Sequence, residues 1–433
     1  MSPVSESVEV LQTLIRFDTV NPPGNERPAI EYLEQYVAAA GFETQVLGCV
    51  DERPNLIATL DSGVPGPVFV FLGHVDTVLA DAEEWEHEPW SGDLADGYLW
   101  GRGSLDMKSQ VACEAVAAVR LARDGWRPAR GALKLVFVSD EETGGDVGAR
   151  WLTEQHPDLV RCDFLLNEGA GAALEAAGIR RYGVCCGEKG IFRFKLTSHG
   201  VAGHASLPRT GDNALLKLAP VLAALGGPQP SYAMTEAPTE LIRSLGGDPS
   251  DPAAWLTAVA TISDRLPIMI EPMFGVTLTP TMIHASDKIN VIPSRAYIKV
   301  DCRVPPGLGA DVASAALHEV LGPLANDLEI EFTEQTYGYA SPSSSPLMDA
   351  LKKWVVDTDP GADTLPVLLP GFSDSSWFRR AFPELIAYGF FPQRYQPLAE
   401  TAALVHNANE RIDVRDLELA TGCYAEMAVA LLG

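Results

Sequence analysis

The chain has 433 residues, of which 46% are hydrophobic and 21% charged, a composition typical of a folded globular enzyme with about two domains. Its 58 acidic and 32 basic residues give a net charge of −26, which argues against a nucleic-acid or anionic-membrane partner. The seven cysteines form no CxxC motif, and no stretch approaches the roughly 18 apolar residues of a membrane span, so we expect a soluble, cytoplasmic protein.

The first part of the chain alternates predicted helices with apolar strands. Helices are expected at 5–17, 26–40, 108–123 and 147–154, and strands at 43–47, 55–60, 68–76, 133–139 and 163–167. The last three strands are continuously apolar, as is typical of strands buried on both faces of a largely parallel sheet. This pattern predicts an α/β domain.

The pattern changes after about residue 187. Alternating apolar residues over 187–200 predict a strand with one exposed face, and a Pro/Gly-rich insert covers 226–252. The remaining elements expected in this region are strands near 274–280, 297–304 and 329–334 and a helix at 310–320. These elements predict a small α+β domain.

The α/β pattern returns at the end of the chain, where a helix is expected over 416–432. We therefore expect an α/β domain in two parts, 1–188 and 337–433, with the α+β domain inserted between them at 189–336.

One imidazole and four carboxylates follow predicted strands or lie where a loop leads into a helix. They are His74, Asp106, Glu141, Glu142 and Glu168. Ligands bind at the carboxyl ends of the strands in open α/β sheets, so these side chains are expected at one edge. Four crowded carboxylates repel one another unless a cation lies among them, and mixed histidine and carboxylate ligands suit zinc, manganese or cobalt. Each residue alone also fits a polar turn or a first helical turn, but the joint pattern favours a metal site.

The number of candidate ligands exceeds the three that a single catalytic zinc requires, which predicts two metal ions about 3.5–4 Å apart. One acid must then stay off the metals and act as a general base. The adjacent residues Glu141 and Glu142 fit this division because neighbouring side chains diverge in direction. Asp76, two residues after His74, is placed to hold the imidazole.

These residues, in this order, resemble the dinuclear zinc amidohydrolase and exopeptidase family, which includes acetylornithine deacetylase, succinyl-diaminopimelate desuccinylase, aminoacylases, dipeptidases and carboxypeptidase S. The resemblance covers nearly the whole chain, in the motifs NPPGNE, GHVD, GRGSLDMK, SDEETGG, GEKG, SHGVAGHASLPRTGDNA, KINVIPS, DCRVPPG, PGFSDSSWFRR and HNANE. It implies a zinc-exopeptidase catalytic domain and an inserted βαββαβ-like lid that also forms a homodimer.

The resemblance also implies a set of site residues that hold two Zn²⁺ ions, with Co²⁺ or Mn²⁺ as substitutes. The implied metal ligands are His74, Asp106, Glu142, Glu168 and His406. Asp106 would bridge the two ions, Glu141 would be the general base, and Asp76 would stand behind His74.

Further implied residues lie outside the metal site. His204 of the inserted domain resembles the residue that crosses to a partner subunit and stabilises the oxyanion. Asn290 and Arg303 match lid positions that contact substrate, although Arg303 also fits a plain salt bridge. Gly371 and Ser373 match the loop on the substrate side.

The resemblance implies hydrolysis of an amide bond next to a free carboxylate in a small-molecule substrate. The YGFFP and HNANE segments and the acidic net charge favour N-acyl-amino acids or dipeptides with an apolar side chain. The alternative within the family is acetylornithine deacetylase or succinyl-diaminopimelate desuccinylase. A more remote alternative is an inactive metal-binding relative, against which stands the presence of Glu141 and all the ligands.

Overall fold

The computed structural model describes residues 5–176, 178–261 and 265–433 and divides into two compact units. Unit 1 contains the described residues up to Gly187 together with Ser341–Val367 and Ser373–Gly433. Unit 2 contains Glu188–Ala340 and Leu368–Phe372. The short second segment of unit 2 was expected in the α/β domain. It groups with unit 2 because the Leu369 carbonyl accepts a hydrogen bond of 3.1 Å from the backbone N–H of Lys189.

Within the described residues, unit 1 contains a nine-stranded sheet in the order β1-β2-β6-β3-β7-β17-β9-β16, with β8 paired to β9. The strands are β1 (Glu43–Leu47), β2 (Asn55–Asp61), β3 (Val68–His74), β6 (Ala132–Val138), β7 (Phe164–Asn167), β8 (Ala173–Ala176), β9 (Ile179–Glu188), β16 (Asp363–Leu369) and β17 (Ile386–Gly389). The pairs β6–β3, β3–β7 and β7–β17 are parallel, whereas β1–β2, β2–β6 and β17–β9 are antiparallel. The parallel centre brings the carboxyl ends of β6, β3 and β7 to one edge.

Helices and a small sheet complete unit 1. The helices are α1 (Glu6–Ile15), α2 (Arg27–Ala38), α3 (Lys108–Arg123), α4 (Ala149–Gln155), α5 (Pro157–Val160), α12 (Pro346–Thr358), α13 (Ser375–Ala381), α14 (Leu398–Leu404) and α15 (Val414–Leu432), with short 3-10 turns η1 (Ala82–Glu84) and η2 (Glu141–Thr143). The small sheet contains β4 (Leu94–Ala95), β5 (Tyr98–Trp100) and β18 (Arg411–Asp413). Among the described residues, we find no helix with the length and apolar character needed to cross a bilayer.

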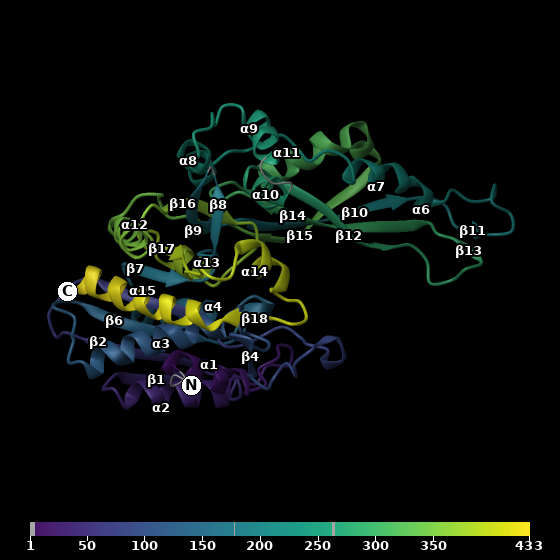
Figure 1. The fold of residues 1–433 in the computed structure, drawn as a ribbon. Coiled ribbons are helices and arrows are strands. Elements are labelled where there is room, and N and C mark those ends of the chain that lie inside the picture. The colour runs from purple at the N-terminus through teal and green to yellow at the C-terminus, as the bar shows by residue number, and fades with distance from the viewer. Residues whose placement is uncertain (1–4, 177, 262–264) are drawn as a thin grey trace. The chain divides into compact units, whose positions relative to one another are not determined.

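Helices cover both faces of the main sheet. Phe71 of β3 packs edge-on against Tyr424 of α15, and its register partner in β6 is Leu135. The preceding residue of β6, Lys134, reaches the Leu159 carbonyl in α5. Because consecutive strand residues point to opposite faces, α15 and α5 lie on opposite sides of the sheet. In Figure 1 the yellow α15 runs alongside α3, against which it packs. This layering confirms the α/β expectation.

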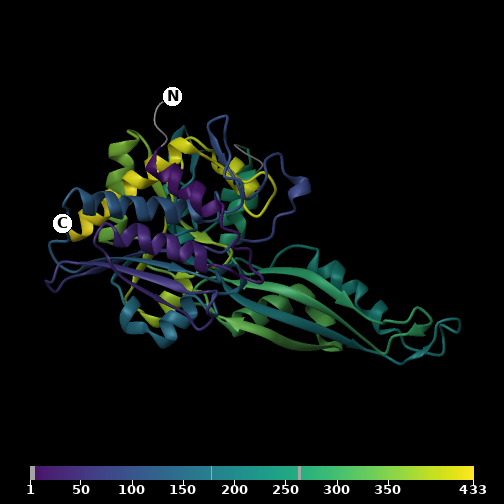
Figure 2. The same ribbon diagram turned by 90° about the horizontal axis from the view of Figure 1, so that it is seen from below.

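Unit 2 is built on a four-stranded antiparallel sheet in the order β12-β14-β10-β15, whose long strands run side by side in Figure 2. Its strands are β10 (Gly190–His199), β12 (Thr277–His284), β14 (Arg295–Val304) and β15 (Leu328–Thr336), and β11 (Gly203–His204) pairs separately with β13 (Val291–Ile292). The helices are α6 (Ala214–Lys217), α7 (Ala219–Leu225), α8 (Glu236–Ser244), α9 (Pro252–Ala260), α10 (Arg265–Ile270) and α11 (Ala310–Leu321), with 3-10 turns η3 (Glu271–Met273) and η4 (Gly322–Asp327).

The core of unit 2 lies between one face of its sheet and the helices α7 and α11. Phe194, Ile298, Val221 and Leu317 belong to this buried cluster. The alternate residues of β15 are exposed, so the other sheet face meets solvent. Unit 2 is therefore the α+β domain that the sequence predicts.

The Pro/Gly-rich insert has helical structure. It contains α8 and leads into α9, which begins at Pro252. The Asp251 carboxylate caps α9 by accepting a hydrogen bond of 3.0 Å from Ala254 N–H. Proline is compatible with the first turn of a helix, where its missing N–H is not needed.

Candidate metal centre

Six of the predicted site residues come together in unit 1. His74 ends β3, Glu141 and Glu142 follow β6 in the turn η2, and Glu168 follows β7. Asp106 lies in the loop before α3 and His406 in the turn between α14 and β18. The parallel centre of the sheet explains the convergence of the first four, because the adjacent strands β6, β3 and β7 end at the same edge.

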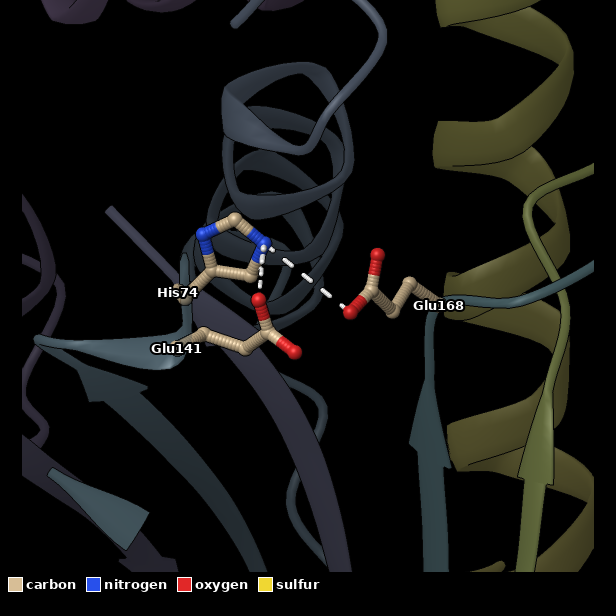
Figure 3. A group of neighbouring side chains, drawn as sticks. All are labelled: His74, Glu141 and Glu168. Carbon is tan, nitrogen blue, oxygen red and sulfur yellow. Dashed lines mark ion pairs between the residues drawn. The ribbon is translucent and has the colours of Figure 1, made fainter. Parts of the chain in front are cut away.

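His74 is the centre of one group of ligand atoms. Its Nε2 lies 3.2 Å from Asp106 Oδ1 and 3.9 Å from both Glu141 Oε2 and Glu168 Oε1. In Figure 3 the Glu141 and Glu168 carboxylates face His74 from two different strand ends. Two overlapping sets have ligand atoms within 4.8 Å of one another: His74 with Glu141 and Glu168, and His74 with Asp106 and Glu142.

His406 forms the second group. Its Nε2 lies 2.9 Å from Asp106 Oδ2 and 3.3 Å from Glu142 Oε2. The two oxygens of Asp106 therefore face two different imidazoles, as a bridging carboxylate would. His406 has a φ of 58°, in the left-handed region that non-glycine residues seldom adopt. Such backbone is kept only where the surrounding structure demands it, and functional sites are the commonest place.

The electrostatics of the cluster show how strongly its acids repel one another. Burial and the charge of Glu168 raise the pKa of Glu141 well above its usual range. Burial and the charge of Asp106 do the same to the pKa of Glu168. Burial also raises the pKa of Glu142, although the hydrogen bond from His406 opposes this shift.

The neighbouring carboxylates stabilise the charged form of both imidazoles, so the pKa values of the imidazoles are raised as well. Burial opposes the charged form of His74, but hydrogen bonds to Asp106 and Asp76 hold its pKa well above the usual value. The hydrogen bonds with Asp106 and Glu142 raise the pKa of His406 to about 10. The cluster therefore attracts positive charge strongly.

The residues present fit a pair of divalent cations. Mixed imidazole and carboxylate donors are the ligand set that zinc, manganese or cobalt accept. Glu142 Oε1 is buried and has no hydrogen-bond partner within the described part of the chain, which leaves a carboxylate oxygen for a ligand outside the protein. Four carboxylates around two imidazoles are otherwise an expensive arrangement in a buried site.

Asp76 supports His74 and the turn that carries Glu141 and Glu142. It is fully buried, and its Oδ1 lies 3.5 Å from His74 Nδ1. Its two oxygens also accept hydrogen bonds of 3.2 Å from the backbone N–H groups of Glu141 and Glu142. The Asp76 carbonyl, 3.1 Å from His74 Nδ1, orients the imidazole, and the Asp76 carboxylate fixes the turn that carries both acids, so Asp76 lies behind His74 as predicted.

Asn21 is a supporting residue to which sequence reasoning assigned no role. Its side-chain amide donates to Asp76 Oδ2 at 2.9 Å, to Asp140 Oδ1 at 3.1 Å and to Thr143 Oγ1 at 3.0 Å. Asn21 belongs to the NPPGNE motif, so the motif was visible, but its partners lie 55 to 122 residues away in the chain.

His204 and Asn290 belong to unit 2. His204 is exposed at the end of β11, and its Nδ1 lies 2.8 Å from Ser206 Oγ. The Asn290 carbonyl accepts a hydrogen bond of 3.1 Å from Ala205 N–H, so the two predicted residues lie close together.

Arg303, Gly371 and Ser373 are distributed differently. Arg303 lies near the end of β14, where its Nε donates to Asp301 Oδ2 at 2.8 Å, so the simpler salt bridge is present. Gly371 groups with unit 2. Ser373 groups with unit 1, where it is buried and its carbonyl accepts from Ser376 N–H.

Comparison with known proteins gives the same answer as the geometry. Residues 70–430 match the model of peptidase family M20/M25/M40. The chain belongs to this family. It is 25% identical to succinyl-diaminopimelate desuccinylase of Hydrogenovibrio crunogenus over 99% of this chain and 100% of that protein.

Solved M20 structures share the fold of the chain. An M20 metallo-carboxypeptidase from Sulfolobus solfataricus superposes with a TM-score of 0.74 at 18% identity, over 99% of both chains. A dinuclear metal-binding M20 peptidase from Bacillus subtilis superposes with a TM-score of 0.60 at 15% identity, over 98% of this chain and 97% of that one. Membership of the M20 family confirms the recognised resemblance and makes the protein a metal-dependent hydrolase of amide bonds.

Removing the metals from this M20 protein is expected to lower its melting temperature, and more at pH 8 than at pH 5. Without metal, the raised pKa values of Glu141, Glu168, His74 and His406 mean that the folded state binds more protons than the unfolded one. The stability of the metal-free protein then falls as pH rises above about 4.5, where the acids of the unfolded chain ionise. It falls further above about 6.5, where the imidazoles of the unfolded chain lose their protons. Metal binding requires deprotonated ligands, so the affinity for metal increases as pH rises.

The check is thermal unfolding with and without a chelator in matched buffers. The melting-temperature difference should widen between pH 5 and pH 8. A difference that shrinks over this interval would contradict the assignment of these groups to a cation site.

Proposed function

We propose that this M20 protein is a dinuclear zinc hydrolase that cleaves N-acyl-amino acids or dipeptides at the amide bond next to their free carboxylate. The observation that carries the proposal is the Asp106 carboxylate, whose two oxygens lie 3.2 and 2.9 Å from the Nε2 atoms of His74 and His406. A bridging acid between two imidazoles, flanked by further acids, supports a two-metal site.

In this proposal the two ions have separate ligands around the shared Asp106. His74 and Glu168 hold the first ion, and Glu142 and His406 hold the second. When bound, the metals would polarise the scissile carbonyl and lower the pKa of water. The identity of the metal as zinc rests on the donor set and on the family.

Glu141 acts as the general base in this scheme. Its carboxylate lies 3.9 Å from His74 Nε2, at the centre of the cluster, and burial with the neighbouring Glu168 raises its pKa. A raised pKa suits a group that must take a proton from the attacking water and give it to the leaving nitrogen. Glu141 therefore takes a proton from the water whose oxygen bonds to the carbonyl carbon, and gives this proton to the nitrogen as the C–N bond breaks.

Arg303 recognises the substrate carboxylate in this proposal. Its Nε is bonded to Asp301, which fixes the guanidinium. The two terminal nitrogens make no hydrogen bond to the described residues and form the planar fork that suits a carboxylate.

His204 supplies the oxyanion donor from a second copy of the chain. Support comes from the length of β14: His204 pairs with Val291, just before this strand, whereas Arg303 lies near its other end. From Arg295 to Arg303 the strand rises about 26 Å at about 3.3 Å per residue. One small substrate cannot span that distance. In this proposal one copy of the chain therefore supplies Arg303 to the substrate, and the other copy supplies His204.

The homodimer would form through the apolar end of unit 2 that carries His204. Leu207, Leu216 and Ile289 are exposed there by 58%, 68% and 102%. Exposed apolar side chains gathered in this way are typical of a protein interface. A hollow lined by Leu216, Ile289 and Val291 lies in the same region.

Leu216→Glu is expected to convert the dimer to monomers, because it places a charge in an apolar interface. Sedimentation or light scattering gives the mass, and activity should fall with dimer content because His204 acts across it. Val356→Glu is the matched control, since Val356 is 51% exposed on α12 of unit 1. A Leu216→Glu protein that remains dimeric would exclude this surface as the interface.

Succinyl-diaminopimelate desuccinylase activity is the second candidate function, favoured by the full-length match to a curated relative of that name. A panel of N-acetyl and long-chain N-acyl amino acids, dipeptides, acetylornithine and succinyl-diaminopimelate, assayed with zinc or cobalt, separates the two. We expect the N-acyl-amino acids or dipeptides to have the highest kcat/KM. A preference for succinyl-diaminopimelate would select the second candidate.

We also propose a cytoplasmic location. Six of the seven cysteines, including the adjacent Cys185 and Cys186 in β9, are buried. Reduced thiols are typical of proteins in a reducing compartment.

A further inference from the structure

Glu410 is a fully buried carboxylate with no assigned role, four residues beyond His406. Its Oε2 accepts hydrogen bonds from Arg102 Nη1 at 2.6 Å and from Gly103 N–H at 3.2 Å. Its Oε1 accepts from the backbone N–H groups of Leu105 at 2.6 Å and Asp106 at 3.0 Å. One side chain therefore accepts three backbone N–H groups of the loop that ends in Asp106.

The backbone around Glu410 ties the same two segments together. The Glu410 carbonyl accepts from Gly101 N–H at 3.0 Å. The next residues form β18, which pairs with β5 immediately before the loop. Arg102 Nη2 also donates to the Leu79 carbonyl, so the guanidinium that pairs with Glu410 is held in place by a second contact. The loop that carries Asp106 and the turn that carries His406 thus form one bonded assembly.

This assembly serves the two proposed metal positions unequally. His74 lies at the end of β3 and Glu168 directly follows β7, so the sheet and Asp76 position the first pair. His406 has no strand or helix of its own and sits in a turn with a left-handed backbone. Its position relative to Asp106 depends on the contacts of Glu410.

We propose that Glu410 is a positioning residue that builds the second metal position by locking His406 and Asp106 into one geometry. The inference rests on the proposed two-metal function and deepens it. Glu410 touches neither metal nor substrate, and acts through the backbone amides of the Asp106 loop. Because the first ion shares only Asp106 with this assembly, the second ion depends on Glu410 more strongly.

The test is a calorimetric titration of the chelated full-length protein with Zn²⁺, comparing the natural chain with E410Q. Glutamine keeps the size of the side chain, but its amide nitrogen donates and cannot accept the N–H groups that one carboxylate oxygen now receives. Outer partners of metal ligands typically contribute 10- to 100-fold in affinity. We expect E410Q to bind the second equivalent 10- to 100-fold more weakly and the first within about threefold of the natural chain.

Asp416→Asn is a matched control for simple destabilisation. Asp416 is also fully buried in unit 1, and its carboxylate accepts the backbone N–H groups of Arg394, Tyr395 and Gln396, none of which neighbours a proposed ligand. Both variants should melt at lower temperature, but only E410Q should lose the second ion. Equal weakening of both ions, or unchanged affinities, would overturn the proposal.

Glu410→Asp keeps the inference testable if E410Q does not fold. Aspartate retains the charge but is one methylene too short to reach all three amides, so the same selective loss of the second ion is expected. Retention of both affinities in Glu410→Asp would overturn the inference. A natural chain that binds one equivalent only would instead refute the two-metal function itself.

Discussion

Replacing Glu141 with glutamine is expected to lower kcat by about 10²- to 10⁴-fold while two metal ions remain bound. Glutamine preserves the shape of the side chain but cannot take a proton from water. The proposed ligands His74, Asp106, Glu142, Glu168 and His406 stay in place, since the backbone N–H of residue 141 still bonds to Asp76. Steady-state kinetics and metal analysis on the same sample provide the measurement.

Glu142→Gln is the matched control for this experiment. Both residues lie in η2, and both backbone N–H groups bond to Asp76, so the two variants disturb the turn equally. Glu142 Oε2 lies 3.3 Å from His406 Nε2, and its loss should weaken metal binding. The reverse result, with metal lost in Glu141→Gln and retained in Glu142→Gln, would exchange the roles of the two acids. That exchange is a real alternative, because Glu141 also falls within ligand distance of His74 and Glu168.

His204→Ala is expected to lower kcat by about 10²- to 10³-fold with little change in bound metal, because it removes a hydrogen-bond donor aimed at the developing oxyanion. Its Nδ1 already contacts Ser206 Oγ, which leaves Nε2 for the substrate. Ser206→Ala removes only the partner of the imidazole and should have the smaller effect. A fully active His204→Ala protein would exclude this role.

Mixing the two inactive variants tests whether His204 acts across the dimer. In a mixed dimer of His204→Ala and Glu141→Gln, one of the two sites has both an intact Glu141 and an intact His204 from its partner. Random exchange makes half the dimers mixed, so about one quarter of the original activity should return. The absence of recovery after verified subunit exchange would mean that His204 serves its own chain.

The central strands of unit 1 and the helix α3 could be predicted from the sequence because their burial leaves a direct pattern. The first five residues of β3, 68–72, are all apolar because both faces of the strand are covered. The helix over Lys108–Arg123 has the predicted ends. The helices of the Pro/Gly-rich insert left no such pattern, since Pro252 fits a helical first turn as well as a loop.

The convergence of the acids could be inferred from strand ends, but their support could not. Asn21 and Glu410 act through hydrogen bonds to residues 55 to 308 positions away, and these partners become neighbours only in the folded chain. The motifs NPPGNE and HNANE pointed to both segments without revealing what either residue does. Hydrogen bonds from a side chain to distant backbone groups have no spacing rule that a sequence can display.

The most direct test of the account is a titration of the chelated protein with Zn²⁺, in which bound metal and turnover of the best panel substrate are followed together. We predict that turnover is absent without metal and reaches its plateau at two equivalents per chain. Glu141→Gln should bind the same two equivalents without turnover. Full turnover by the metal-free protein, or no turnover of any panel substrate with two equivalents bound, would contradict the proposed function.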